Sequence, residues 1–75
     1  MEQEFIIRFK EALEINDQVI TLDTRFRDLE NWSSLSFLSI LAMIDEEYDV
    51  VIEGNDFRDL VTVEDLIKEI KKQKA

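Results

Sequence analysis

The serine pair Ser33-Ser34, between Trp32 and Leu35, is the part of the chain whose residue types and spacing could do chemistry. An apolar stretch typical of a helix follows, so Ser33 is predicted to be its N-cap, accepting a hydrogen bond from a backbone N–H one turn further on. Ser34 then falls in the first turn, where backbone N–H groups lack partners and the helix dipole is positive. A phosphate ester is stabilised at such a position. The sequence therefore predicts one serine that caps the helix and one that is available for attachment.

Composition argues against catalysis by the chain itself. With no histidine and no cysteine, it cannot form the usual zinc sites, a histidine-based triad or a thiolate nucleophile. A calcium loop around Gly54 is also excluded, because Val51 stands at position 3 of the loop, which requires an oxygen ligand. The 75 residues form a single predicted domain, 1–75, with one small core and no room for a deep catalytic cavity. We therefore expect a carrier or binding module and not an enzyme, and we expect no metal site.

The charge of the chain indicates what it binds. A net charge of −9 repels nucleic acids and anionic membrane surfaces and favours basic protein patches. The segment that starts at Met1 lacks the basic region of a secretion signal, and no apolar run reaches the roughly 20 residues of a membrane span. We therefore expect a cytoplasmic protein, a monomer, without nucleic-acid partners and without a membrane span.

The hydrophobic pattern predicts an all-α fold. Apolar residues at helical spacing, with capping signals, indicate three main helices and one short helical turn. The expected elements are a helix over 3–15, a long loop over 16–31, a helix over 34–48, a helical turn over 57–60 and a helix over 63–72. Phe26 and Leu29 should hold the loop on the core. Thr62 and Asp65 have the spacing of a capping box at the start of the last helix.

The second predicted helix is apolar on nearly all sides over its first ten residues. We assign Leu38, Leu41 and Tyr48 to the core. For three other apolar side chains, two interpretations stay open, namely core packing and contact with a ligand or partner. These are Leu35, Phe37 and Met43. The helix ends in an acidic cluster made of Asp45, Glu46, Glu47 and Asp49. This cluster is either a solvated helix end or a recognition patch.

The whole pattern resembles the acyl carrier protein family. The resemblance rests on Phe26-Arg27-Asp28-Leu29, on Ser33-Ser34-Leu35, on the acidic cluster followed by Ile52, and on Thr62-Val63. It implies that Ser34 carries 4′-phosphopantetheine, donated by coenzyme A through a phosphopantetheinyl transferase, with Ser33 as the helix cap and Leu35 beside the attachment point. The arm would supply the thiol that the chain lacks. Acyl groups held on it as thioesters would be presented to acyl-loading and acyl-processing enzymes with basic docking surfaces. The residues implied in docking are Ser36, Phe37, Asp45, Glu46, Glu47 and Asp49.

The chain departs from the family pattern at three positions on the serine side of the helix. Ser33 stands where the family usually has Asp, and Ser36 and Ser39 stand where many members have acidic side chains. These departures favour a specialised fatty-acid or polyketide-type pathway. A peptidyl or aminoacyl carrier has the same architecture and remains an alternative. A second alternative, from another class, is an unmodified acidic module that docks on basic proteins.

Overall fold

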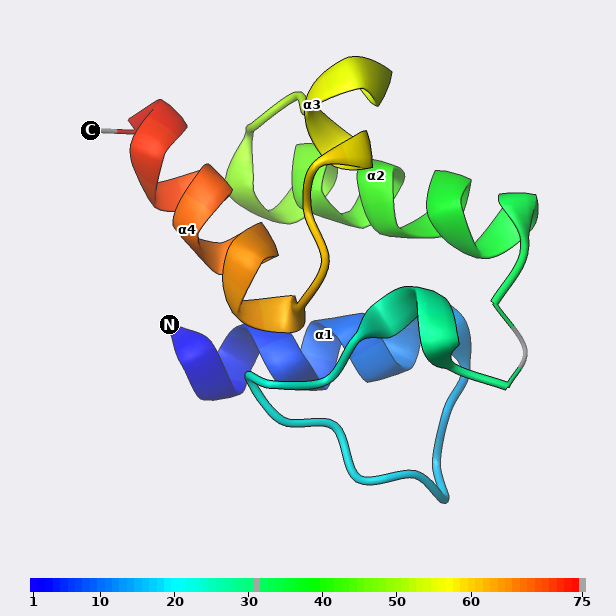
Figure 1. The fold of residues 1–75 in the computed structure, drawn as a ribbon. Helices are drawn as coiled ribbons and strands as arrows, with labels where there is room; N and C mark the ends of the chain where they lie inside the picture. The colour runs from blue at the N-terminus through cyan, green and yellow to red at the C-terminus, as the bar shows by residue number, and fades with distance from the viewer. Residues whose placement is uncertain (31, 75) are drawn as a thin grey trace.

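The computed structural model describes residues 1–30 and 32–74 (Figure 1). Its elements are α1 (Glu2–Leu13), a 3-10 turn η1 (Phe26–Asp28), α2 (Ser34–Tyr48), α3 (Gly54–Arg58) and α4 (Val63–Lys74). The prediction of an all-α fold with three main helices, a short helical element and a long loop before the second helix is confirmed. Asn31, within the predicted loop, and Ala75 lie outside the described residues.

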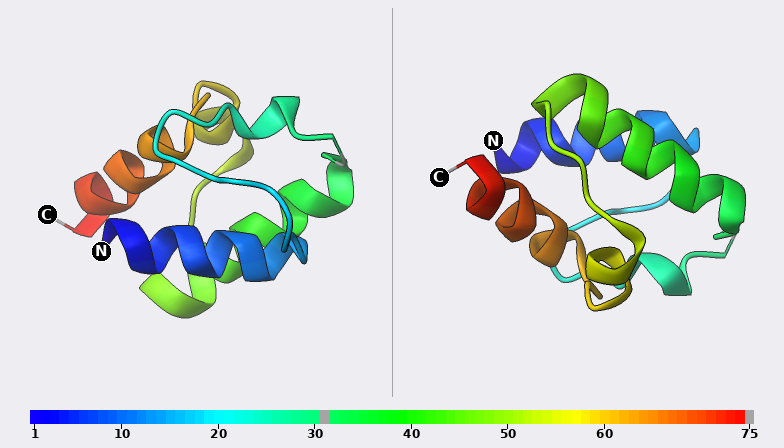
Figure 2. Two further views of the ribbon diagram at one scale, coloured as in Figure 1. Left: turned by 90° about the horizontal axis from the view of Figure 1, so that it is seen from below. Right: turned by 90° about the horizontal axis from the view of Figure 1, so that it is seen from above.

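Helices α1 and α2 pack against each other most extensively, and α4 lies across one end of the pair (Figures 1 and 2). The described ends of the chain lie at that same end of the molecule, whereas α2 begins at the opposite end (Figures 1 and 2). Across the described residues, no helix has both the length and the apolar character needed to cross a membrane.

A core rich in aromatic side chains holds the helices together. Phe5 and Phe9 on α1 are fully buried, with ring centroids 6.2 Å apart. Phe26 of η1 is also fully buried and lies 5.3 Å from the ring of Phe57 on α3. Burying each such ring stabilises the fold by roughly 1.5–3 kcal/mol. Leu29 packs against this core, so the prediction that Phe26 and Leu29 hold the loop is confirmed.

Backbone hydrogen bonds attach the long loop to the start of α4. The N–H of Val63 donates to the carbonyl of Thr24, and the N–H of Glu64 donates to the carbonyl of Leu22, both at 3.0 Å. The first N–H groups of a helix lack partners within the helix, so the loop carbonyls satisfy donors that would otherwise be unpaired. The loop is therefore held against the start of α4 at Leu22 and Thr24.

The predicted capping box at the start of α4 is confirmed. The N–H of Asp65 donates to the Thr62 hydroxyl at 3.2 Å, and the N–H of Thr62 donates to the Asp65 carboxylate at 3.1 Å. The N–H of Val61 donates to the same carboxylate at 2.9 Å. The backbone N–H groups of Val61 and Thr62 lower the pKa of Asp65 because they stabilise its ionised form, and Val61 has the larger effect.

Several predicted boundaries were wrong by a few residues. Helix α1 ends at Leu13 because Glu14 adopts a left-handed conformation with φ 56°, which stops the helix two residues before the predicted end. Helix α4 continues to Lys74. The short helix begins at Gly54, where the sequence predicted a turn. The glycine has no positive φ, and the N–H of Phe57 closes the first turn on the carbonyl of Glu53 at 2.9 Å.

The assignment of Leu38 to the core was wrong, since this side chain is 57% exposed. Helix α2 buries Ile40, Met43 and Ile44 instead, while Leu41 and Tyr48 are partly buried against the core as predicted. The reason is the direction in which the helix faces α1. Helix α2 has more apolar residues than one face can bury, so packing against α1 determines which of them are buried.

We predict that Ile40→Ala lowers the free energy of unfolding by about 2–5 kcal/mol, because it leaves a cavity at a fully buried position. Leu38→Ala, two residues away on the same helix, should change it by less than about 0.5 kcal/mol. Urea denaturation followed by circular dichroism measures both. Equal losses in the two variants would contradict the orientation of α2.

Candidate functional site at the start of helix α2

The side chains of Ser33 and Ser36 cap the start of α2. The N–H of Ser36 donates to the Ser33 hydroxyl at 3.4 Å, and the N–H of Ser33 donates to the Ser36 hydroxyl at 3.3 Å. This arrangement is a reciprocal capping box. It places Ser33 at the N-cap and fixes the direction in which the chain enters the helix.

Ser34 is the first residue of α2, and its side chain is exposed. Within the described part of the chain, its hydroxyl has no hydrogen-bond partner. The first turn of this 15-residue helix contains no acidic residue. The positive end of the helix dipole is therefore not offset locally by a carboxylate, which favours a phosphate group on this hydroxyl.

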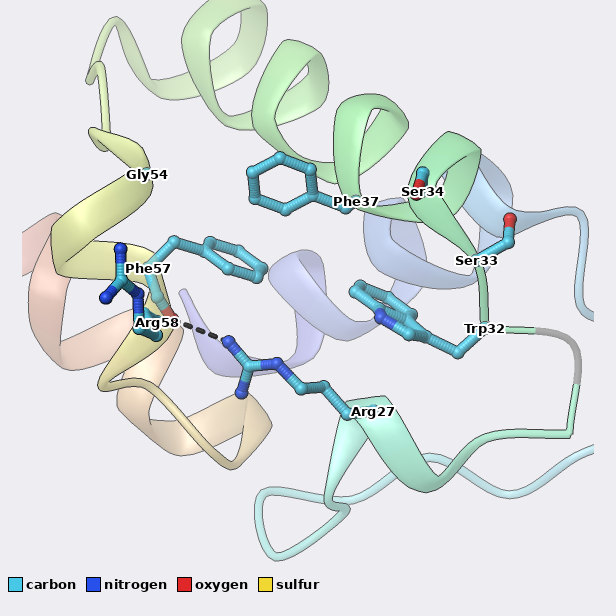
Figure 3. Close-up of a pocket in the computed structure, with 8 residues that line it drawn as sticks. All are labelled: Arg27, Trp32, Ser33, Ser34, Phe37, Gly54, Phe57 and Arg58. Carbon is cyan, nitrogen blue, oxygen red and sulfur yellow. Dashed lines mark hydrogen bonds between the residues drawn. The ribbon is translucent and has the colours of Figure 1, made fainter.

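An open groove of about 430 Å³ lies beside Ser34, between the start of α2 and α3 (Figure 3). Its lining residues come from four segments of the chain: Arg27, Trp32, Ser33, Ser34, Phe37, Gly54, Phe57 and Arg58. The sequence pattern identified the serines, but it did not indicate that Arg27, Trp32 and α3 would converge on them.

Aromatic rings form much of the groove wall. Phe37 on α2 meets Phe57 on α3 edge to face, with centroids 4.8 Å apart. Trp32, in the loop before the serines, lies 5.2 Å from the ring of Phe26. Such pairs contribute about 0.5–1.5 kcal/mol beyond the area they bury. Packing thus holds the walls of the groove in place.

Arg27 connects η1 to α3 across the groove. Its guanidinium donates to the carbonyl of Phe57 at 2.8 Å and to the carbonyl of Leu60. It also lies over the rings of Phe26 and Phe57, 4.9 and 5.2 Å from their centroids. The sequence places Arg27 within the Phe26–Leu29 motif but gives no sign of carbonyl partners about thirty positions later.

The residues predicted to contact partners on the serine side of α2 do not share one face. Phe37 points into the groove (Figure 3), and the Ser36 hydroxyl is engaged in the capping box. The exposed apolar side chains of this stretch are Leu35, 72% exposed, and Leu38. Leu35 therefore lies on the surface next to Ser34, as a contact residue requires.

The acidic cluster of Asp45, Glu46, Glu47 and Asp49 lies at the other end of α2, and all four residues are exposed. At 1.5 Å per residue, it is about 20 Å from Ser34 along the helix axis. Glu47 pairs with Arg8 of α1 at 2.6 Å, so part of its charge is compensated. Across residues 1–30 and 32–74, no group of acidic side chains is arranged to hold a metal ion.

The fold is that of a small helical module with an exposed serine at the start of its longest helix. Comparison with known proteins identifies its family. The model of the phosphopantetheine attachment site family matches residues 3–70. The chain is 34% identical over 65 residues to an acyl carrier protein of Borrelia garinii subsp. bavariensis, covering 87% of this chain and 81% of that protein. An acyl carrier protein of Rickettsia massiliae is 31% identical over 75 residues, which is 100% of this chain and 87% of that protein. The chain belongs to the acyl carrier protein family.

Membership of this family defines the general role of the chain. Acyl carrier proteins are carriers and not catalysts, and their prosthetic group is 4′-phosphopantetheine. The role implies interaction with acyl-handling enzymes. The start of α2 fits the group, because it offers an accessible hydroxyl, a positive helix end without a neighbouring acid in its first turn, and an open groove alongside.

We predict that Ser33→Ala lowers the free energy of unfolding by about 0.5–2 kcal/mol, since it removes the N-cap acceptor. Ser33→Asp keeps an acceptor and adds a negative charge at the positive helix end, so its stability should match or exceed that of the wild type. Urea denaturation at low ionic strength distinguishes the two variants. An unchanged stability in Ser33→Ala would show that the capping box contributes nothing measurable.

Proposed function

We propose that Ser34 is the residue that carries 4′-phosphopantetheine. The observation that carries this proposal is the division of roles among the four serines of the chain. The hydroxyls of Ser33 and Ser36 are engaged with each other's backbone N–H groups, and Ser39 lies partly buried in the second turn of α2. Ser34 alone combines exposure with a place in the first helical turn.

Electrostatics supports the same residue. A negative charge within the first turn of a helix is stabilised by about 0.3–1 kcal/mol, and here no acid of the first turn competes for that position. When bound, the group supplies a terminal thiol on which acyl groups are held as thioesters. The chain contributes no cysteine of its own, so its residues position the group and supply the surface that enzymes contact.

We infer a specialised fatty-acid or polyketide-type pathway from the surface of α2. The stretch from Ser34 to Ile44 contains no charged side chain, so this half of α2 offers an approaching enzyme only apolar and hydroxyl groups. A partner adapted to an acidic surface at this point would find no counter-charge. The enzymes of this pathway should therefore present an apolar surface opposite the first half of α2.

Contact with partners, including the phosphopantetheinyl transferase, is proposed to have two parts. Leu35 and Leu38 are one helical turn apart and both exposed, which suits an apolar contact near Ser34. Asp45 and Glu46, at the far end of the helix, would meet basic side chains and accelerate the encounter. Only the second part should weaken as salt is added.

Attachment is tested by incubating the protein with coenzyme A and a broad-specificity phosphopantetheinyl transferase, followed by intact mass spectrometry and peptide mapping. The wild type should gain one phosphopantetheine on Ser34, and Ser34→Ala should gain none. Ser39→Ala is the matched control and should be modified like the wild type. Modification of Ser34→Ala would overturn the proposal, and circular dichroism verifies that this variant is folded.

The two-part contact is tested by measuring association and dissociation rates with the transferase. Leu38→Ala should raise the dissociation rate about fivefold at every salt concentration, which is the factor expected for about 1 kcal/mol of contact energy. Glu46→Gln should lower the association rate at low salt only, because salt screens exposed charges. Asp17→Asn, which removes one exposed acid of the long loop, is the charge control. Equal effects of Glu46→Gln and Asp17→Asn would show that only net charge matters.

A further inference from the structure

The groove beside Ser34 differs in charge from the rest of the molecule. The chain has 18 acidic and 9 basic residues, yet the groove is lined by two arginines and by no acidic side chain. Its other walls are aromatic rings and the start of α2. A concave surface of this kind attracts an anion that also has an apolar part.

Arg58 is the arginine with hydrogen-bonding capacity to spare. Its Nη2 donates to the side-chain oxygen of Asn55 at 2.9 Å, and a guanidinium has five N–H donors. The ion pairs found among the described residues involve Arg8 and Lys68 but not Arg58. Arg27, in contrast, is engaged by two backbone carbonyls and two rings. Arg58 is therefore the cation that a guest in the groove could pair with.

The position of Arg58 indicates which anion it meets. In Figure 3, Ser34 and Arg58 lie at opposite ends of the groove, and the rings of Phe37 and Phe57 lie between them. A phosphate ester on Ser34 would be bonded to the hydroxyl at the first end. A charge that reaches the second end must come from a more distant part of whatever Ser34 carries. The rings in between suit a run of carbon atoms.

We propose that this groove receives an acyl group whose far end carries a carboxylate, and that Arg58 selects for that charge. The inference rests on the proposed attachment at Ser34. The partly exposed ring of Phe37, packed against the buried ring of Phe57, contacts the carbon atoms of the acyl group. The Arg58 guanidinium pairs with the carboxylate. Charge-assisted pairs of arginine and carboxylate are about twice as strong as neutral hydrogen bonds, so a neutral acyl group of equal length is held more weakly.

The test loads Ser34 with a matched pair of groups. Coenzyme A analogues carrying a succinyl or a butyryl group through a stable amide are transferred to the protein, and the product is checked by mass spectrometry. The two groups have the same number of carbon atoms and differ in the terminal carboxylate. The readout is the NMR signal of the arginine Nε–H groups, with the backbone signals of Gly54 and Phe57. Unacylated phosphopantetheine provides the reference state.

We expect the succinyl group to shift the Arg58 Nε–H signal and the groove signals, and the butyryl group to leave the Arg58 signal at its reference position. In Arg58→Gln the succinyl-specific shifts should be lost. They should persist in Arg25→Gln, which removes an exposed arginine outside the groove lining, and in Asn55→Ala, which removes only the present partner of Arg58. Added salt should reduce the shifts.

Four results would overturn the inference. Equal shifts with both acyl groups would show that the groove does not distinguish charge. An Arg58 signal that already moves on attachment of unacylated phosphopantetheine, with no further change on succinylation, would identify the phosphate as the anion. Failure of either group to attach to folded protein would overturn the attachment proposal as well, whereas attachment without any Arg58 shift would overturn this inference alone.

Discussion

The arrangement around Ser34 depends on the contacts of one side chain, Arg27. Its guanidinium donates to the carbonyl of Phe57 in α3 and to that of Leu60 just after the helix, and it lies over the rings of Phe26 and Phe57. Helix α3 has only five residues, too few for stability of its own. Its position opposite α2, and with it the width of the groove, follows from Arg27 and from the Phe37–Phe57 contact. The long loop thus determines the shape of the site from a distance.

Ser33 and Ser34 are consecutive in the chain but have different roles at the start of α2. A helix start needs acceptors for its unpaired N–H groups, and Ser33 and Ser36 meet that need by pairing with each other. Ser34, the first residue of the helix, therefore takes no part in the capping. An attachment point is best placed on a well-anchored backbone with an unengaged side chain, and the start of α2 provides both.

Local rules made part of this structure predictable and long-range packing determined the remainder. The helices, the Thr62–Asp65 box and the placement of Ser33 before Ser34 follow from spacing and capping preferences that act within a few residues. The orientation of α2 does not, because an almost uniformly apolar helix has no polar face to set its register, and Leu38 was assigned to the core for that reason. The groove could not be predicted either, because its lining combines Arg27 and Trp32 with residues of α3 that lie about 20 to 30 positions later in the chain.

Trp32 has a consequence of a different kind. It is the only tryptophan of the chain, and it stands in the wall of the groove next to the serines (Figure 3). Its indole is partly buried and rests near Phe26, so its surroundings change with whatever enters the groove. The intrinsic fluorescence of the unlabelled protein, excited where only indole absorbs, is therefore an optical signal that originates at this one site.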